Sequence, residues 1–156
     1  MSGHIHEKID FAVSIYIVYE NKVFLRVHDK LKIWLPVGGH IELHEDPNQA
    51  ALREAKEESG LDVVLYGTSR EPIEKGLRGL IPPIYLNIHD ILDKHRHVGM
   101  IYFATSSSNV INPSDIDGDR SDNWKWFTRD ELDDYKYPLR NEVRFYAQEA
   151  LKALGK

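Results

Sequence analysis

The segment GGHIELHEDPNQAALREAKEESGLDV, residues 38–63, is the most informative part of the chain, because it combines a clearly delimited helix with a group of carboxylates. Its pattern predicts a helix over residues 46–59. Asp46 is a favourable N-cap residue, and Gln49, three positions later, completes a capping-box pattern. Gly60 suits the left-handed conformation in which many helices end. These local signals define where the helix begins and ends.

Three glutamates lie together on one side of this predicted helix. At 100° per residue, Glu54, Glu57 and Glu58 share an arc of about 100°. Like charges at this spacing repel one another, and the C-terminal half of a helix is where the helix dipole disfavours negative charge. A hard divalent cation such as Mg²⁺, which prefers carboxylate oxygens, would remove both penalties. The alternative is a solvated acidic face with Arg53 and Lys56 as ion-pair partners.

The rest of the chain alternates apolar, β-branched stretches with turn-forming residues and two further helical patterns. This mixture predicts an α/β fold with helices layered on a mixed sheet. The predicted strands cover residues 9–19, 23–27, 33–37, 61–66, 84–91, 98–104 and 123–127, and the third of them is expected to end at Gly38-Gly39. Further helices are predicted over residues 129–132 and 139–154, and loops over residues 76–83 and 106–122.

The composition is that of an ordinary globular protein. The 156 residues suit one domain over residues 1–156, and 42% apolar with 29% charged residues excludes a wholly disordered chain. No apolar run approaches the ~20 residues of a membrane span, and the first ten residues lack the apolar stretch of a secretory signal. We therefore expect a cytoplasmic protein with no membrane partner. Because the chain has no cysteine, disulfides and cysteine nucleophiles are excluded.

The net charge restricts the class of partner. A formal charge of −5 with neutral histidines argues against polymeric nucleic acid, whose binding surfaces are basic. A small phosphorylated substrate fits better, provided that a metal ion or a local basic patch offsets the repulsion. A homodimer is compatible with the sequence.

The spacing of residues 39–61 matches the Nudix box at each of its defined positions, so the chain resembles the Nudix hydrolases. The matching positions are Gly39, Glu45, Arg53, Glu54, Ala55, Glu57, Glu58, Gly60 and Leu61. A chance match at so many fixed positions is very improbable. One departure is Leu43-His44, where many members of the family have glycine just before the glutamate.

The resemblance implies a Nudix-type α/β/α sandwich with a central mixed β-sheet, and Mg²⁺-dependent hydrolysis of a diphosphate linked to another group, with Mn²⁺ as an alternative ion. By position, Glu57 and Glu58 would be the principal metal ligands, and Glu54 a further ligand or a base. The resemblance also implies that the main-chain carbonyl of Gly38 reaches the metal and that Arg53 orients the glutamates. Glu45 would brace the loop against the helix.

A general base is also expected from the predicted loop over residues 106–122. Members of the family often supply an acidic residue from such a loop, and metal-bound glutamates are poor proton acceptors. Arg120 occupies the place where that residue is most expected. We therefore assign the role to Asp119 or Asp122, with Glu54 and a merely solvated acidic loop as the alternatives.

The substrate class follows only in outline. We expect a small nucleotide or nucleoside diphosphate derivative, and keep an oxidised or non-standard nucleoside triphosphate as the alternative. ADP-ribose hydrolases of the family often carry a marker proline after the Nudix box, and in this chain Gly76 occupies that position. A non-catalytic nucleotide-sensing module is a further alternative, although all three glutamates are present. The isomerase branch of the family relies on a cysteine, which this chain lacks.

Two other groups of side chains have uncertain roles in the sequence. Arg26 and His28 alternate with the apolar face of their strand, so they point either to the substrate or to solvent. His95 and His97 would share a strand face and contact phosphate or a second metal. A polar hairpin end is the favoured interpretation of these two histidines.

Overall fold

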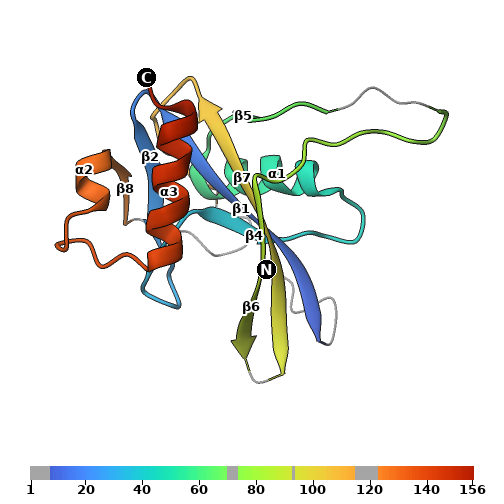
Figure 1. The fold of residues 1–156 in the computed structure, drawn as a ribbon, viewed down its shortest axis with the longest axis horizontal. Helices are drawn as coiled ribbons and strands as arrows, with labels where there is room; N and C mark the ends of the chain where they lie inside the picture. Colours follow the sequence, from blue (N-terminus) through green and yellow to red (C-terminus); the bar gives the residue numbers. More distant parts are fainter. Residues whose placement is uncertain (1–7, 70–73, 93, 115–122) are drawn as a thin grey trace.

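The long strand β1 organises the fold. The computed structural model describes residues 8–69, 74–92, 94–114 and 123–156. Its elements are β1 (Ile9–Tyr19), β2 (Lys22–Val27), β3 (Trp34–Leu35), β4 (Val37–His40), α1 (Pro47–Ser59), β5 (Val63–Leu65), β6 (Tyr85–Leu92), β7 (His95–Ser106), β8 (Trp124–Phe127), α2 (Arg129–Leu132) and α3 (Asn141–Leu154). Figure 1 labels all of them except the short strand β3.

All eight strands belong to one mixed sheet. β1 runs parallel to β7 along most of its length, and every other pairing is antiparallel. One edge of β1 is shared by two partners, because β4 pairs with its first half and β2 with its end. β5 and β6 likewise divide β7 between them, and β3 and β8 pair with β2. The strand order therefore brings β4 beside the centre of the sheet.

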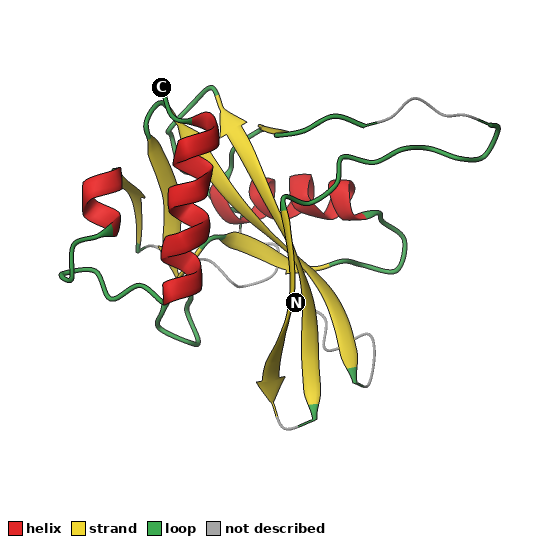
Figure 2. Ribbon diagram, viewed as in Figure 1, coloured by secondary structure: helices red, strands yellow, loops and turns green. Residues whose placement is uncertain are grey.

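The two faces of the sheet bury separate apolar clusters. Alternate side chains of a strand point to opposite faces, so Ile15 and Ile17 pack with α1 while Tyr16 and Val18 pack with α3. The two helices therefore cover opposite faces of the sheet (Figure 2). This arrangement confirms the predicted α/β/α sandwich around a mixed sheet.

The ends of α1 are those that the sequence predicts. The side chain of Asp46 accepts a hydrogen bond from the main-chain N–H of Gln49 at 2.9 Å, and the side chain of Gln49 accepts one from the N–H of Asp46 at 2.9 Å. This reciprocal pair is a complete capping box. Gly60 ends the helix with φ of 79°, in the left-handed region.

The predicted strand over residues 33–37 is wrong in its extent. Two short strands, β3 and β4, replace it, and Gly38 and Gly39 lie inside β4 rather than ending it. A Cβ atom on Gly38 would collide with the main-chain oxygen of Val13, and one on Gly39 would collide with the carboxylate of Glu54. Glycine stands here because β4 runs very close to β1 on one side and to α1 on the other.

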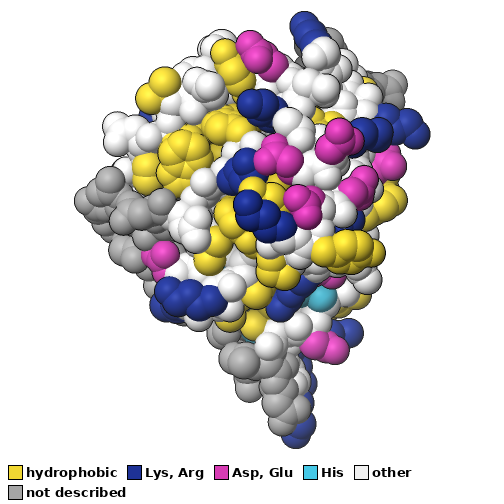
Figure 3. Space-filling model, turned by 90° about the vertical axis from the view of Figure 1, so that its left-hand side faces the viewer, with side chains coloured by type: hydrophobic (Ala, Val, Ile, Leu, Met, Phe, Trp, Pro, Cys, Tyr) yellow, Lys and Arg dark blue, Asp and Glu magenta, His cyan; other side chains and the backbone are white. Residues whose placement is uncertain are grey.

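The surface agrees with the charge of the sequence. Figure 3 shows the side of the molecule on which α2 lies, where acidic, basic and apolar side chains of the described residues are interspersed and form no basic stripe. Within the described ranges, none of the helices combines the length and apolar character that crossing a bilayer requires.

Candidate active site

Arg53 on α1 is the centre of the polar network beside β4. Its Nη1 donates to Glu54 Oε1 at 2.9 Å and to Glu57 Oε2 at 3.2 Å. Its Nη2 donates to the main-chain oxygen of His40 at 3.0 Å and to Glu45 Oε1 at 2.6 Å, and its Nε donates to Glu45 Oε2 at 3.0 Å. One guanidinium therefore joins two of the three predicted glutamates to the strand and to the loop before the helix.

Glu45 completes this connection from the loop side. Besides Arg53, it accepts the main-chain N–H of Glu42 at 2.9 Å. Burial tends to raise the pKa of Glu45, but the hydrogen bonds from Arg53 and from the Glu42 N–H outweigh burial and leave this pKa lowered. The Glu45 hydrogen bond is in turn the main cause that raises the pKa of Arg53. Each partner therefore holds the other in its charged form.

Glu58 has a different set of partners, which lie deeper in the molecule. Arg26 on β2 donates to Glu58 Oε2, and both side chains are almost fully buried. The main-chain N–H of Gly38 donates to Glu58 Oε1 at 2.6 Å. From the sequence, Arg26 was expected to point either to the substrate or to solvent. A charged residue within the apolar strand 23–27, on the same face as Phe24, is the signal that could have found it.

Glu54 lies against the main chain of β4. Its side chain is 11% exposed and occupies the space where a side chain on Gly39 would stand. Glu57 is more exposed than Glu54, with 18% of its side chain accessible. The predicted residues Gly38, Arg53, Glu54, Glu57 and Glu58 are therefore brought together by α1 and β4.

The donor set suits a hard divalent cation. Glu45, Glu54, Glu57 and Glu58 contribute four formal negative charges, and Arg26 and Arg53 contribute two positive ones. The formal balance is −2, which one divalent cation would neutralise. Lys56, the alternative ion-pair partner predicted for the glutamates, instead contacts Asp62 at 3.2 Å.

Asp119 and Asp122, the predicted bases, lie outside the described residues. The chain that precedes them contacts the end of α1, where the main-chain N–H of Ser114 donates to the main-chain oxygen of Glu57 at 2.8 Å. The chain that follows them lies beside β2, where the main-chain oxygen of Asn123 accepts from the Val27 N–H at 2.8 Å.

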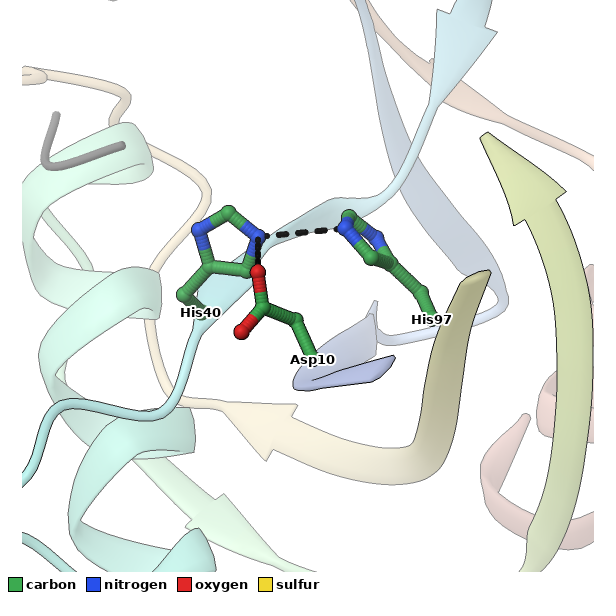
Figure 4. A group of neighbouring side chains, drawn as sticks. All are labelled: Asp10, His40 and His97. Atoms are coloured by element: carbon green, nitrogen blue, oxygen red, sulfur yellow. Dashed lines mark hydrogen bonds and ion pairs between the residues drawn. The ribbon is translucent and has the colours of Figure 1, made fainter. Parts of the chain in front are cut away.

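A second polar group lies on the other face of β4, and the sequence analysis predicted only part of it. His40 Nε2 is 3.2 Å from His97 Nε2 and 3.7 Å from Asp10 Oδ2, and the three side chains point toward one another from β4, β7 and β1 (Figure 4). His95 Nε2 is 3.4 Å from the same Asp10 oxygen. The preferred interpretation of His95 and His97 as a polar hairpin end is therefore incomplete, because His95 is buried and both histidines join this cluster.

The surroundings of His97 disfavour its charged form. Its pKa is lowered to about 4, mainly by burial and further by the neighbouring His40, His89 and His95, whereas Asp10 acts in the opposite direction. His97 is therefore a neutral imidazole near neutral pH.

A family model described as the NUDIX domain matches residues 8–148, which is most of the chain. The chain belongs to the Nudix hydrolase family. The sequence resemblance is thereby confirmed, and the Nudix box coincides with α1 and the loop before it. Nudix hydrolases generally use divalent metal ions, in keeping with the oxygen-rich donor set on α1.

A solved Nudix hydrolase from Clostridium perfringens is 37% identical to this chain, with a TM-score of 0.82, over 92% of this chain and 97% of that chain. Two more distant structures show the shared fold alone. One is an ADP-ribose pyrophosphatase from Streptococcus suis, with 20% identity and a TM-score of 0.57, over 92% of this chain and 90% of that chain. The other is a C. elegans Ap4A hydrolase, with 19% identity and a TM-score of 0.58, over 92% and 93%. The comparison with curated proteins found no match.

Proposed function

We propose that this Nudix hydrolase cleaves a diphosphate linkage in a small nucleotide or nucleoside diphosphate derivative, using Mg²⁺. The observation that carries the proposal is the convergence of Glu54, Glu57 and Glu58 beside β4, held there by Arg53 and Arg26. Carboxylates held this close to one another, with a formal excess of two negative charges, suit a divalent cation rather than a solvated face.

Glu57 and Glu58 are the proposed principal ligands, with Glu54 and the main-chain carbonyl of Gly38 as further ones. Mn²⁺ is the alternative ion, because its ligand preferences are similar. Divalent ions at such sites neutralise the charge of a diphosphate and acidify a bound water. The ADP-ribose and Ap4A named for two of the neighbours are small nucleotide derivatives, which agrees with this substrate class.

The two arginines have positioning roles in this proposal. Arg53 fixes the carboxylate orientations of Glu54 and Glu57 through its Nη1, while Glu45 holds its other edge. Arg26 and the Gly38 N–H hold the two oxygens of Glu58. Because these carboxylates are oriented before any ligand arrives, little reorganisation is needed on binding.

Asp119 or Asp122 remains the proposed general base. The described residues on both sides of this segment support the assignment, because Ser114 contacts the backbone of Glu57 and Asn123 contacts β2 next to Arg26. We expect Asp119→Asn or Asp122→Asn to lower kcat with little change in Mg²⁺ affinity, since a base acts only in the transition state. Steady-state kinetics across a Mg²⁺ titration measures both quantities.

The matched controls for the base are Asp115→Asn and Asp117→Asn in the same segment, together with Glu54→Gln. If all four aspartate variants keep wild-type turnover while Glu54→Gln abolishes it, the base lies on α1 instead. The Mg²⁺ titration would then show whether Glu54 also acts as a ligand.

The decisive experiment for the function is a nucleotide panel with Mg²⁺, scored for each released phosphate species. It should contain nucleotide sugars, dinucleoside polyphosphates, and standard and oxidised triphosphates, with Glu57→Gln as the inactive control. The proposal predicts that a diphosphate derivative is cleaved fastest. Preferential release of pyrophosphate from an oxidised triphosphate would favour the alternative activity, and tight binding without turnover would indicate a sensing module.

The proposal also covers partners and setting. We propose that residues 1–156 act as one domain, in the cytoplasm, where nucleotides and Mg²⁺ are abundant. Polymeric nucleic acid is not the expected substrate, and faster cleavage of capped or 5′-triphosphate RNA than of every free nucleotide would contradict this. Light scattering on the purified chain would test the homodimer.

A further inference from the structure

The Asp–His cluster lies on the face of the sheet opposite to the Nudix glutamates. Asp10 shares its face of β1 with Tyr16 and Val18, which pack with α3, because the residues are separated by even numbers. His40 is paired with Ala12, two residues from Asp10, and His97 is paired directly with Asp10. Gly39, the neighbour of His40, contacts Glu54 on the opposite face.

The donor atoms of Asp10, His40 and His97 have the spacing of a metal centre. They all lie within 4.8 Å of one another. In a tetrahedral zinc site with bonds of about 2.0–2.1 Å, neighbouring donors lie about 3.3–3.4 Å apart. The observed separations from His40 Nε2, 3.2 Å to His97 and 3.7 Å to Asp10, differ from that spacing by only a few tenths of an ångström.

The chemistry and support of the cluster also suit such an ion. Two imidazoles and one carboxylate form a ligand set for zinc and related divalent transition metals, while Mg²⁺ prefers oxygen donors. Asp10 is 1% exposed and also contacts His95, a partner of the kind that orients a metal-ligating carboxylate.

We propose that Asp10, His40 and His97 form a second metal site, selective for zinc-class divalent transition metals and separate from the glutamates of the Nudix box. His95 is a supporting residue that orients Asp10. The ion would tie β1, β4 and β7 together at the end of the sheet that extends beyond α3 (Figure 2). Because the main-chain oxygen of His40 accepts from Arg53, the ion would also fix a strand that the glutamate network uses.

Cobalt is the most informative probe, because Co²⁺ bound to nitrogen donors in four- or five-coordinate geometry has intense visible bands and octahedral Co²⁺ on oxygen donors has weak ones. We would titrate the full-length, metal-stripped protein with Co²⁺ in excess Mg²⁺, and then displace Co²⁺ with Zn²⁺. The expected result is one intense, Zn²⁺-displaceable Co²⁺ per chain. Its affinity should fall at least ~100-fold in His97→Ala, which is the upper end of the loss caused by removing a supporting partner alone.

Control variants test whether the Co²⁺ bands come from Asp10, His40 and His97 or from other histidines. His44→Ala removes an exposed histidine of the loop before α1, and His4→Ala/His6→Ala removes the histidines near the start of the chain, so both should keep the bands. Glu57→Gln should also keep them, which separates this site from the proposed active site. Asp10→Asn and His40→Gln are second variants in case His97→Ala folds poorly, as judged by near-UV circular dichroism.

Three results would overturn the proposal. The first is the absence of intense bands in the wild type, which would leave the cluster as a hydrogen-bonded network only. The second is unchanged affinity in well-folded His97→Ala or Asp10→Asn. The third is loss of the bands in His4→Ala/His6→Ala while His97→Ala retains them, which would place the ion near the start of the chain.

Discussion

The two faces of β4 differ in the chemistry that they present, although they belong to the same four-residue strand. On one face, Gly39 leaves room for Glu54, and carboxylates gather around Arg53. On the other face, His40 meets His97 and Asp10. The first face offers oxygen donors with a formal excess of negative charge, and the second offers mainly imidazole nitrogens.

This difference would allow one strand to support the two metal sites that we propose. Neighbouring residues of a strand point to opposite faces, so a glycine and a histidine side by side serve different sites without competing for space. The charges are also balanced in different ways. Buried or half-buried guanidinium groups offset the glutamates, whereas Asp10 lies against the imidazoles of His40 and His95.

The largest expected effect on stability comes from breaking the buried ion pair between Arg26 and Glu58. Arg26→Met leaves Glu58 without its buried cationic partner, and removing one partner of a buried pair costs about 3–5 kcal/mol. Urea denaturation of the variant measures this loss. The double variant Arg26→Met/Glu58→Met is the control and should recover most of it, because no charge is then left uncompensated. Equal stability of the single variant and the wild type would contradict the buried pair.

The next largest effect is on turnover, and it concerns only the glutamates on one face of β4. Glu57→Gln should lower kcat by at least ~10²-fold, because a metal that activates water contributes several kcal/mol. The fold should survive, since the substitution relieves like-charge repulsion and opens no cavity. The Co²⁺ bands expected from the site of Asp10, His40 and His97 should remain, so they serve as an internal control. Turnover near that of the wild type at saturating Mg²⁺ would rule out the assigned ligand role.

A smaller effect tests the close contact between β4 and α1. Gly39→Ala places a methyl group against Glu54, so we expect a loss of about 1–3 kcal/mol from overpacking. Displacement of the carboxylate should also reduce kcat, because small errors in position are costly at such sites. Adding Glu54→Asp shortens the acid and should restore stability but not turnover. If Gly39→Ala has neither effect, Glu54 is free to move away from the strand.

The smallest effect is the pH dependence that His97 gives to the metal-free protein. Its pKa is about 4 in the folded protein against 6.5 for an unperturbed histidine, so the unfolded chain binds more protons between these two values. Stability should therefore fall as the pH is lowered from about 6.5 towards about 4. Thermal melts in a chelator would record this slope, and His97→Gln should flatten it. A slope unchanged in that variant would assign the effect to other groups.

The sequence alone determined where α1 lies and which carboxylates it groups together. The ends of α1, its capping box and the grouping of Glu54, Glu57 and Glu58 depend on residues within a few positions of one another, so helical geometry fixes them. Arg53 and Glu45 lie in the same short segment, so the Nudix box identified them as well. The layered α/β fold was also predictable, because the apolar stretches and helical patterns alternate along the chain.

Only the tertiary structure decided which side chains meet across the sheet. Arg26 and Glu58 are 32 residues apart, and His40 and His97 are 57 apart, so no local spacing connects them. Their meeting depends on the register of β1 against β4 and β7 and on β2 lying beside β1. A shift of one residue in a strand would turn each of its side chains to the other face. That register is set by burial of the whole core, which is why the sequence favoured a polar hairpin end over a metal site for His95 and His97.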